Sequence, residues 1–237
     1  MRTSLLRLAA LALASAATPA FAGVDVGGGV SISGNATLVS DYRFRGISLS
    51  DEDVAIQGGI DVTHDSGLYV GTWASSIDGG DVYGHTEVDL YGGYRREIVS
   101  GLTLDVGLLY YAYPDGDVGD AEYFEPYGSL TYSIGPATIE TGFAYAWDQS
   151  ALGDTDNLYV YSDVGVGIPG TPVTLTGHLG YTDGPLSLVA DGDTIDWSLG
   201  GRASFGPVTV GLAYVDTDIR HNDLADATVV GSVGVSF

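Results

Sequence analysis

Charged side chains recur at alternate positions around residues 85–96, where Glu87, Asp89 and Arg95 share one phase. Alternate side chains of an extended strand point to opposite faces, so these charges lie on one face and Val88 and Leu90 on the other. A row of carboxylates can attract cations toward a polar interior or hold hard cations. The same phase in other segments predicts further interior charges. They are Asp61, Asp105, Glu125, Glu140, Asp163, His178, Asp196 and Arg202.

The elements that would position these side chains are alternating segments of about ten residues, the length that a tilted strand needs to cross an outer membrane. Glycines spread along the chain disfavour helices after the N-terminal segment. Pro126 lies inside the sixth segment and predicts a β-bulge near the outer rim. We predict twelve strands. They span residues 30–40, 53–64, 67–77, 85–96, 102–113, 123–134, 137–147, 158–168, 173–182, 194–204, 208–215 and 227–237.

The connections between these strands alternate in length. Short ones follow the even-numbered strands and longer ones the odd-numbered strands, as in up-and-down outer-membrane barrels with short periplasmic turns. The last strand is amphipathic and ends on Phe237. In a soluble domain it would leave an open edge, whereas in a closed barrel it pairs on both sides. We therefore predict an all-β fold, a transmembrane up-and-down antiparallel β-barrel of about 12 strands in the outer membrane of a Gram-negative bacterium.

The N-terminal segment carries Arg2 and Arg7, an apolar run rich in leucine and alanine, and the small residues Ala20 and Ala22. This pattern predicts a signal peptide over residues 1–22 that is cleaved before a single barrel domain at 23–237. The alternative is a membrane anchor, but the run is short for a spanning helix.

The composition excludes several classes of protein. Two of the eight basic residues lie in the signal segment, so six basic residues face 31 acidic ones after it and the net charge there is −25. Nucleic acid is therefore not an expected partner, because it requires basic patches. The hydrophobic content of 45% argues against disorder. Since there is no cysteine, disulfides and thiolate metal sites are excluded.

Eight interior carboxylates oppose Arg95 and Arg202 in this prediction. Such an excess predicts an interior that favours cations, with some carboxylates paired as structural bridges. We favour a narrow hydrated path over a plugged barrel. The phase of residues 67–77 stays open, because Leu68 and Val70 compete with Tyr69 and Trp73 for the outward face.

The predicted outer loops carry paired acids such as Asp51 and Asp53. These pairs can weakly bind divalent cations or bridge such ions to lipopolysaccharide. Asp is also a common turn former, and we favour this structural role. No tightly bound metal or other cofactor is expected. The first loop also carries Arg43 and Arg45. These arginines can pair with carboxylates, fold the loop inward as a constriction, or hold a lipid phosphate.

The first loop and the segments Ala55 to Gly59, Gly67 to Ser75 and Asp89 to Tyr94 resemble the TorF-type porin family of proteobacteria, a conserved outer-membrane barrel family of unknown function. The resemblance covers residues 35–94. It implies an outer-membrane barrel described as a porin. It supplies neither a solute nor a binding motif.

Three functions are consistent with the sequence. The first is a porin-like channel for passive diffusion of small cationic or neutral solutes through the acidic interior. The second is a structural or adhesive barrel without flux. The third and weakest is a lipid-modifying enzyme, for which no suitable Ser and His pair stands out; we expect no enzyme. Expected partners are outer-membrane lipid, lipopolysaccharide and the barrel assembly machinery, which would bind the strand ending in Phe237. The oligomeric state is left open.

Overall fold

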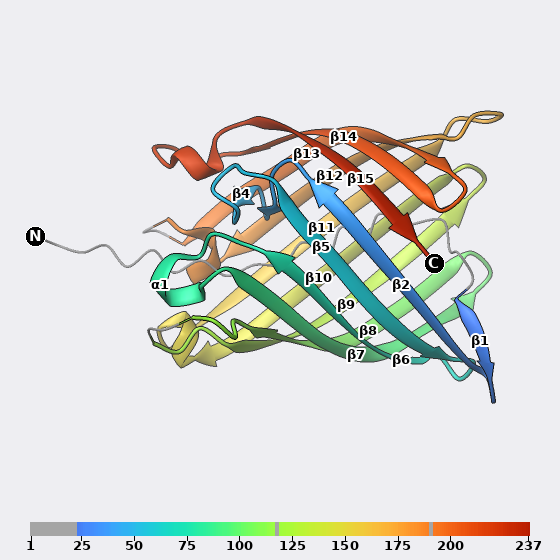
Figure 1. The fold of residues 1–237 in the computed structure, drawn as a ribbon, viewed down its shortest axis with the longest axis horizontal. Helices are drawn as coiled ribbons and strands as arrows, with labels where there is room; N and C mark the ends of the chain where they lie inside the picture. Colours follow the sequence, from blue (N-terminus) through green and yellow to red (C-terminus); the bar gives the residue numbers. More distant parts are fainter. Residues whose placement is uncertain (1–22, 117–118, 190–191) are drawn as a thin grey trace, which may run out of the picture.

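The computed structural model describes residues 23–116, 119–189 and 192–237. Within these ranges twelve antiparallel strands close into one barrel, which confirms the predicted fold class (Figure 1). The predicted signal peptide at residues 1–22 lies outside the described residues. The strands are β2 (Val30–Val39), β5 (Ala55–His64), β6 (Leu68–Ser76), β7 (Thr86–Val99), β8 (Leu102–Ala112), β9 (Tyr123–Ile134), β10 (Ala137–Gln149), β11 (Thr155–Gly167), β12 (Val173–Asp183), β13 (Asp193–Phe205), β14 (Val208–Thr217) and β15 (Thr228–Ser236).

The barrel closes between its first and last strands. β2 pairs with β5 along one side and with β15 along the other. Gly34 and Phe237 exchange two backbone hydrogen bonds of 2.8 and 2.9 Å at the end of this seam. Closer to the start of β2, the short strand β1 (Val24–Gly27) pairs with the same side of β2. Closure therefore removes the open edge that the amphipathic last strand would otherwise present.

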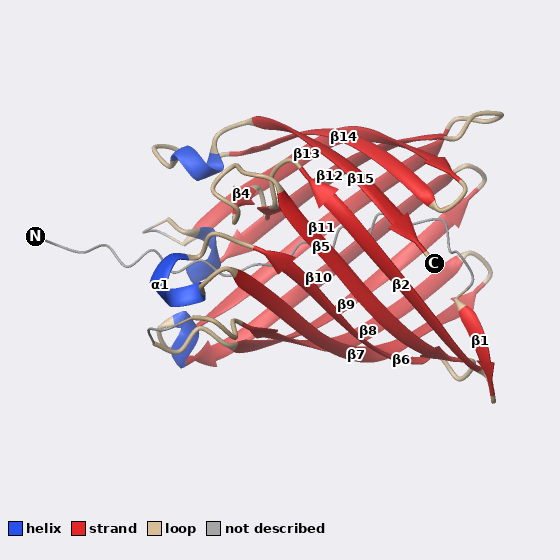
Figure 2. Ribbon diagram, viewed as in Figure 1, coloured by secondary structure: helices blue, strands red, loops and turns tan. Residues whose placement is uncertain are grey.

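The two ends of the barrel differ, as Figure 2 shows. One end, here called the turn end, carries the connections 65–67, 100–101, 135–136, 168–172 and 206–207. The other, the loop end, carries the longer connections together with the short helix α1 (Gly80–Tyr83) and three one-turn 3₁₀ segments, η1 (Ser150–Leu152), η2 (Pro185–Ser187) and η3 (Asp223–Ala225). β10 and β11 extend beyond the predicted ends, so their connection shrinks to residues 150–154. No described helix is long and apolar enough to cross a membrane.

The outer surface of the barrel is a belt of large apolar side chains. Leu199 on β13 and Leu212 on β14 are 63% and 62% exposed, while the alternate residues face inward. The structure also settles the phase of β6. Leu68 and Val70 each expose 59% of their surface outward, while the Tyr69 hydroxyl hydrogen-bonds Asp105 inside the barrel.

The predicted bulge at Pro126 is wrong. The β8–β9 register runs without a shift through Leu108 and Pro126, and the β9–β10 ladder stops at Tyr127. Proline has no N–H to continue that ladder. Past the end of this ladder, the Gln149 side chain bonds the β9 backbone in place of a strand. It accepts from the Phe124 N–H at 2.8 Å and donates to the Phe124 carbonyl at 2.9 Å. A side chain thus replaces the lost strand pairing.

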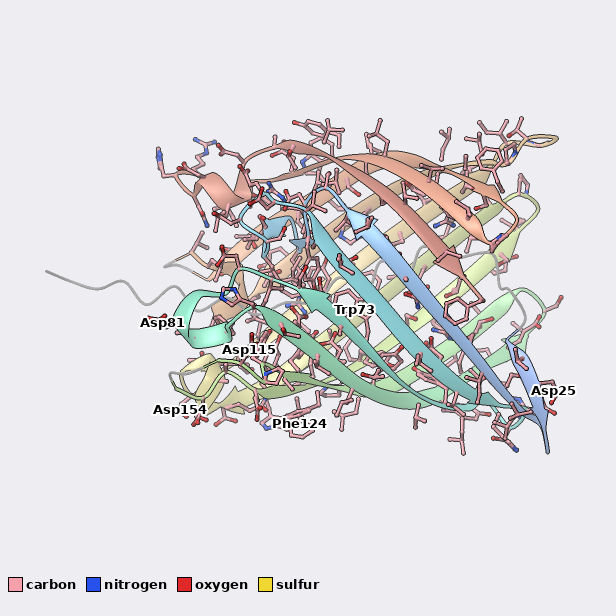
Figure 3. The ribbon with its side chains drawn as sticks, viewed as in Figure 1. Asp25, Trp73, Asp81, Asp115, Phe124 and Asp154 are labelled. Carbon is pink, nitrogen blue, oxygen red and sulfur yellow. The ribbon has the colours of Figure 1, made fainter. Side chains whose placement is uncertain are left out.

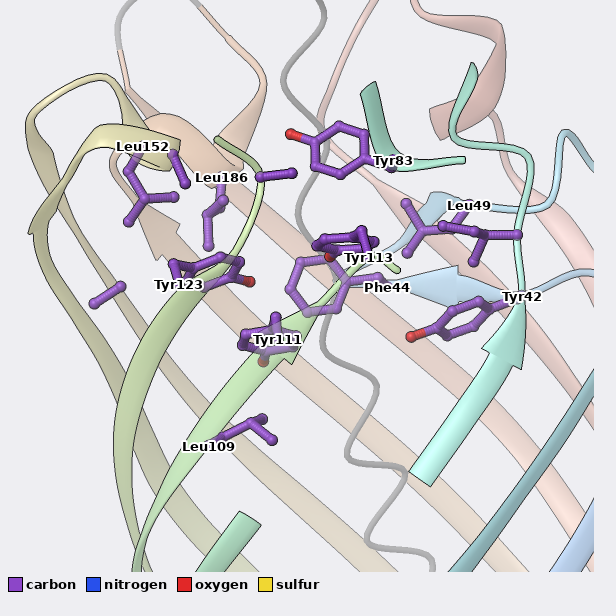
Figure 4. Close-up of a cluster of buried hydrophobic side chains, with 14 of the residues drawn as sticks. Tyr42, Phe44, Leu49, Tyr83, Leu109, Tyr111, Tyr113, Tyr123, Leu152 and Leu186 are labelled. Carbon is purple, nitrogen blue, oxygen red and sulfur yellow. The ribbon is translucent and has the colours of Figure 1, made fainter. Parts of the chain in front are cut away.

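The buried apolar core lies inside the barrel at its loop end, where aromatic and leucine side chains from the strands and from the first loop meet (Figure 4). Tyr111 and Tyr123 stack with ring centroids 4.3 Å apart, and Phe44 from the first loop is 1% exposed beside them. Barrels of about eight strands have an interior just wide enough for strand side chains to fill. Here a loop supplies part of the filling.

Candidate functional site: the inward-folded loop and the acidic interior

The loop between β2 and β5, residues 40–54, folds into the barrel and contains a small hairpin of β3 (Arg43–Phe44) and β4 (Ile47–Ser48). Arg45 and Gly46 form its tip with φ angles of +46° and +84°. Two successive positive φ angles are typical of a tight hairpin turn and suit glycine, but they strain arginine. The loop therefore holds Arg45 in a costly conformation at the point that reaches deepest into the interior.

Arg45 is bound to the opposite wall of the barrel. Its Nη2 donates to both carboxylate oxygens of Glu125 on β9, at 2.9 and 3.1 Å, and both side chains are at most 1% exposed. The guanidinium also lies 4.2 Å from the ring centroid of Tyr159. Burial lowers the pKa of Arg45, but Glu125 and three nearby tyrosines together raise it by more, so the net pKa lies above the usual value. The arginine stays charged and anchors the loop.

Arg43 fastens the base of the same hairpin. It pairs with Asp41 and, at 3.1 Å, with Glu52, and its Nη1 donates to the carbonyls of Leu224 and Asp226 in the last loop at 2.9 and 3.0 Å. The two arginines of this loop thus do different work. Arg43 joins neighbouring loops, whereas Arg45 crosses the interior.

Asp51 and Asp53, the other two candidates in this loop, are exposed. Neither side chain takes part in a hydrogen bond or ion pair with the inward hairpin among the contacts of the described residues. The structure separates them from the arginines that sequence reasoning grouped with them.

A second buried polar group lies beside the hairpin on β7. Glu87 is 0% exposed and Asp89 is 4% exposed. The Tyr42 hydroxyl donates to Glu87 at 3.2 Å, while its ring packs edge-on against Trp73 with centroids 5.5 Å apart. The Glu87 and Asp89 carboxylates approach the loop because the period of β7 turns both inward. They extend the row of interior carboxylates up to the inward-folded loop.

Nearer the turn end, tyrosines bind the interior carboxylates. Tyr91 donates to Asp61 at 2.6 Å. Tyr69 donates to Asp105 at 2.6 Å and Arg95 Nη2 binds the same carboxylate at 2.6 Å. The sequence placed Arg95 inside but did not predict the hydrogen bonds from Tyr69 and Tyr91, although the alternating phase on β6 and β7 is the signal that could have found them.

Further along the wall, His178 on β12 lies between two carboxylates. Its Nδ1 is 2.8 Å from Asp163 and its Nε2 is 2.9 Å from Asp196. Nε2 also lies 2.9 Å from the Tyr159 hydroxyl. Carboxylate oxygens accept hydrogen bonds, so a ring that donates to both Asp163 and Asp196 carries a positive charge. Glu140 accepts from Thr131 at 2.9 Å and from Tyr161 at 3.1 Å.

The positive side of the interior is thus larger than the sequence suggested. Arg45 and His178 join Arg95 and Arg202 against the eight carboxylates counted in the sequence. Among these named residues, eight carboxylates face four side chains that can carry a positive charge. Arg202 differs from the other three because it makes no ion pair among the described residues, and its buried Nη1 has no hydrogen-bond partner there.

Some acidic residues of the longer loops, such as Asp115 and Asp218, hold local structure in the described ranges. Asp115 accepts from the backbone N–H of His85 and Thr86 at 3.0 and 3.1 Å, which ties two loops together. Figure 3 shows Asp81, Asp115 and Asp154 at the loop end and Asp25 at the opposite end. In the part of the chain that the structure describes, no group of three or more His, Asp or Glu side chains is arranged to hold a metal ion.

A family model matches residues 24–236, almost the whole described chain. The chain belongs to the Gcw_chp family of bacterial proteins of unknown function. The family model is not named TorF, so the expected resemblance to TorF-type porins is not confirmed. The chain is assigned to the Gcw_chp family alone. A comparison with curated proteins finds no match.

Solved structures show what this Gcw_chp member is similar to in fold. The NanC porin is 12% identical with a TM-score of 0.57, and the alignment covers 87% of this chain and 99% of that one. The KdgM porin, solved in complex with disordered oligogalacturonate, is 8% identical with a TM-score of 0.57, covering 87% and 97%. The COG4313 outer membrane channel from Pseudomonas putida F1 is 12% identical with a TM-score of 0.53, covering 92% and 97%. At such identities the likeness concerns the barrel.

Proposed function

We propose that the protein is a porin-type channel of the outer membrane that lets small cationic or neutral solutes diffuse through an acidic interior. The observation that carries the proposal is a closed barrel whose interior holds eight carboxylates and a loop that narrows it, anchored by Arg45 on Glu125. Outer-membrane porins with similar barrels support the class of protein. In this proposal the loop end faces the outside and the turn end the periplasm.

The acid lining supports a preference for cations. Rings of carboxylates attract cations and repel anions in a narrow path. The KdgM structure was solved with oligogalacturonate, which carries many carboxylates. Such a polyanion does not suit this interior. The resemblance of residues 35–94 to TorF-type porins agrees with a channel but names no solute.

Ion flow through purified protein in a planar bilayer tests this function. We expect small conductance steps and a reversal potential that favours potassium over chloride. Replacing residues 42–49 with a short Gly/Ser linker removes the constriction and is expected to enlarge the steps. As a control, Asp51→Asn changes an exposed position of the same loop and should leave the conductance as it is.

A second function, a structural or adhesive barrel without flux, is favoured by one observation. The loop-end interior is packed with buried aromatic side chains, and Tyr111 and Tyr123 are at most 1% exposed. Bilayers that stay silent for both the wild type and the shortened-loop variant would support this function and overturn the channel. Chloride preference would contradict the role that we assign to the carboxylates.

The prediction that the protein is not an enzyme is retained. His64 Nδ1 lies 2.8 Å from Ser66 Oγ, but this contact joins residues two apart in the exposed turn after β5 and closes that turn. The partners that we propose are outer-membrane lipid, lipopolysaccharide and the assembly machinery acting on the strand that ends in Phe237. Weakly bound divalent cations at the acidic loops stay a prediction.

A further inference from the structure

Arg202 on β13 differs in its surroundings from the other interior arginines. Arg45 binds Glu125 and Arg95 binds Asp105. Arg202 makes no ion pair with any carboxylate of the described residues, and its buried Nη1 lacks a hydrogen-bond partner there. A buried charged donor without a partner is costly, so it marks a place where a ligand group can be bound.

The arginine lies in an open cavity at the turn end of the barrel. The cavity measures about 310 Å³ and is bounded by β11, β12 and β13 and by the turn 168–172. That volume is room for roughly ten water molecules at about 30 Å³ each. Besides Arg202 it is lined by Gly167, Thr171, Pro172, Val173, Thr174 and Ser204.

Two hydroxyls on neighbouring strands accompany the guanidinium. Thr174 on β12 is the direct register partner of Arg202, and Ser204 is two residues further along β13 on the same inward face. Thr174 can donate a hydrogen bond to an anionic oxygen, and Ser204 can do so while its Oγ accepts from Thr209 Oγ1, 3.0 Å away. The cavity lining contains no carboxylate. The nearest acids along these strands, Asp163 and Asp196, are already bound to His178.

We propose that Arg202, with the hydroxyls of Thr174 and Ser204, binds a small oxyanion at the turn end of the barrel, through a carboxylate or phosphate group. The planar guanidinium presents parallel N–H donors that match two oxygens of either group. The rest of such a molecule fits the open cavity. The site is separate from the constriction at Arg45 and does not require the anion to pass through the barrel.

Equilibrium dialysis of the folded barrel in detergent tests the site, with labelled inorganic phosphate and labelled citrate as separate probes. We expect saturable binding of at least one probe with one equivalent per barrel. Arg202→Gln should weaken it by at least about tenfold, because charge-assisted hydrogen bonds are lost. Which probe binds identifies the group that the site prefers.

Matched variants make the outcome specific. Arg96→Gln removes an exposed arginine at the same end, whose Nη1 reaches the Ser66 carbonyl at 3.3 Å, and should leave binding unchanged. Arg202→Lys keeps the positive charge but loses the parallel N–H donors of the guanidinium, so we expect intermediate binding. If Arg202→Gln does not fold, Thr174→Val and Ser204→Ala carry the test and should each weaken binding. The proposal is overturned if neither probe binds saturably, if Arg202→Gln binds as well as the wild type, or if Arg96→Gln loses as much.

Discussion

The tip of the inward-folded loop fits closely against Thr217 on β14, because a Cβ atom on Gly46 would lie 2.1 Å from Thr217 Cγ2. Gly46 also has a φ of +84°, which disfavours any other residue. We expect Gly46→Ala to release the hairpin from the interior at a cost of about 2 kcal/mol or more. Arg43 and Arg45 would then become accessible, so trypsin should cut after them, as detected by mass spectrometry.

Two variants separate the close contact from the backbone strain. Gly28, in the turn between β1 and β2, has a similarly positive φ of +69° but no heavy atom within 4 Å of an added Cβ. Gly28→Ala therefore controls for a strained alanine outside the loop and should leave the loop protected. Thr217→Ser removes the clashing methyl group and should restore protection to Gly46→Ala. Equal cleavage of the wild type and Gly46→Ala would show that the loop does not depend on this contact.

Removing one member of the Arg45 and Glu125 pair is expected to destabilise the barrel. Both side chains are at most 1% exposed, so Arg45→Met leaves a buried carboxylate and Glu125→Gln a buried guanidinium without its charged partner. Each change should lower the free energy of unfolding by about 3–5 kcal/mol. Urea titration of the protein in phospholipid vesicles measures it. The double variant Arg45→Met/Glu125→Leu should lose much less than the two single losses together.

The ion pair between Arg95 and Asp105 serves as the comparison for the buried pair of Arg45 and Glu125. The Arg95 side chain is 66% exposed and that of Asp105 is 9% exposed, and Asp105 keeps a second hydrogen bond from Tyr69. Water screens such a pair, so Arg95→Gln should cost no more than about 1 kcal/mol. Similar losses at Arg45 and Arg95 would contradict the burial of the loop.

The apolar belt makes a depth-dependent prediction. Leu199 lies near the middle of β13 and is 63% exposed on the outer surface, whereas Val208 starts β14 at the turn end and is 39% exposed. In vesicles Leu199→Lys should cost about 2–4 kcal/mol and Val208→Lys no more than about 1 kcal/mol, because the penalty for a charge falls from the bilayer midplane to the interface. Equal, small costs at both positions would rule out a membrane around this belt.

His178 should moderate the cation preference of the channel. Its two contacts with Asp163 and Asp196, at 2.8 and 2.9 Å, place one positive charge between two negative ones. His178→Gln removes that charge, so the preference for potassium over chloride should rise, on the order of twofold. Reversal potentials in a potassium chloride gradient measure it, with His221→Gln in an exposed loop as the control. An unchanged or lower preference would contradict the charged state of His178.

Strand number and the phase of most strands could be predicted from the sequence because they follow from local geometry, whereas the phase of β6 was settled only by the structure. The two-residue period of β7 turns Glu87 and Asp89 to the same side whatever the rest of the chain does. Pro126 shows the limit of local reasoning. The sequence shows that Pro126 lacks an N–H. Whether the lost pairing leads to a bulge or is replaced by side-chain hydrogen bonds depends on Gln149 at the end of the next strand.

The sequence by itself determined a closed barrel with an apolar outside and longer loops gathered at one end, and it predicted an acidic inside. Only the tertiary structure decided that the first loop turns inward, that Arg45 meets Glu125 from 80 residues away, and that Arg202 is left without a carboxylate. The reason is physical. A strand's alternation depends on neighbouring residues alone, whereas the pairing of buried charges depends on which strands the closed wall brings face to face.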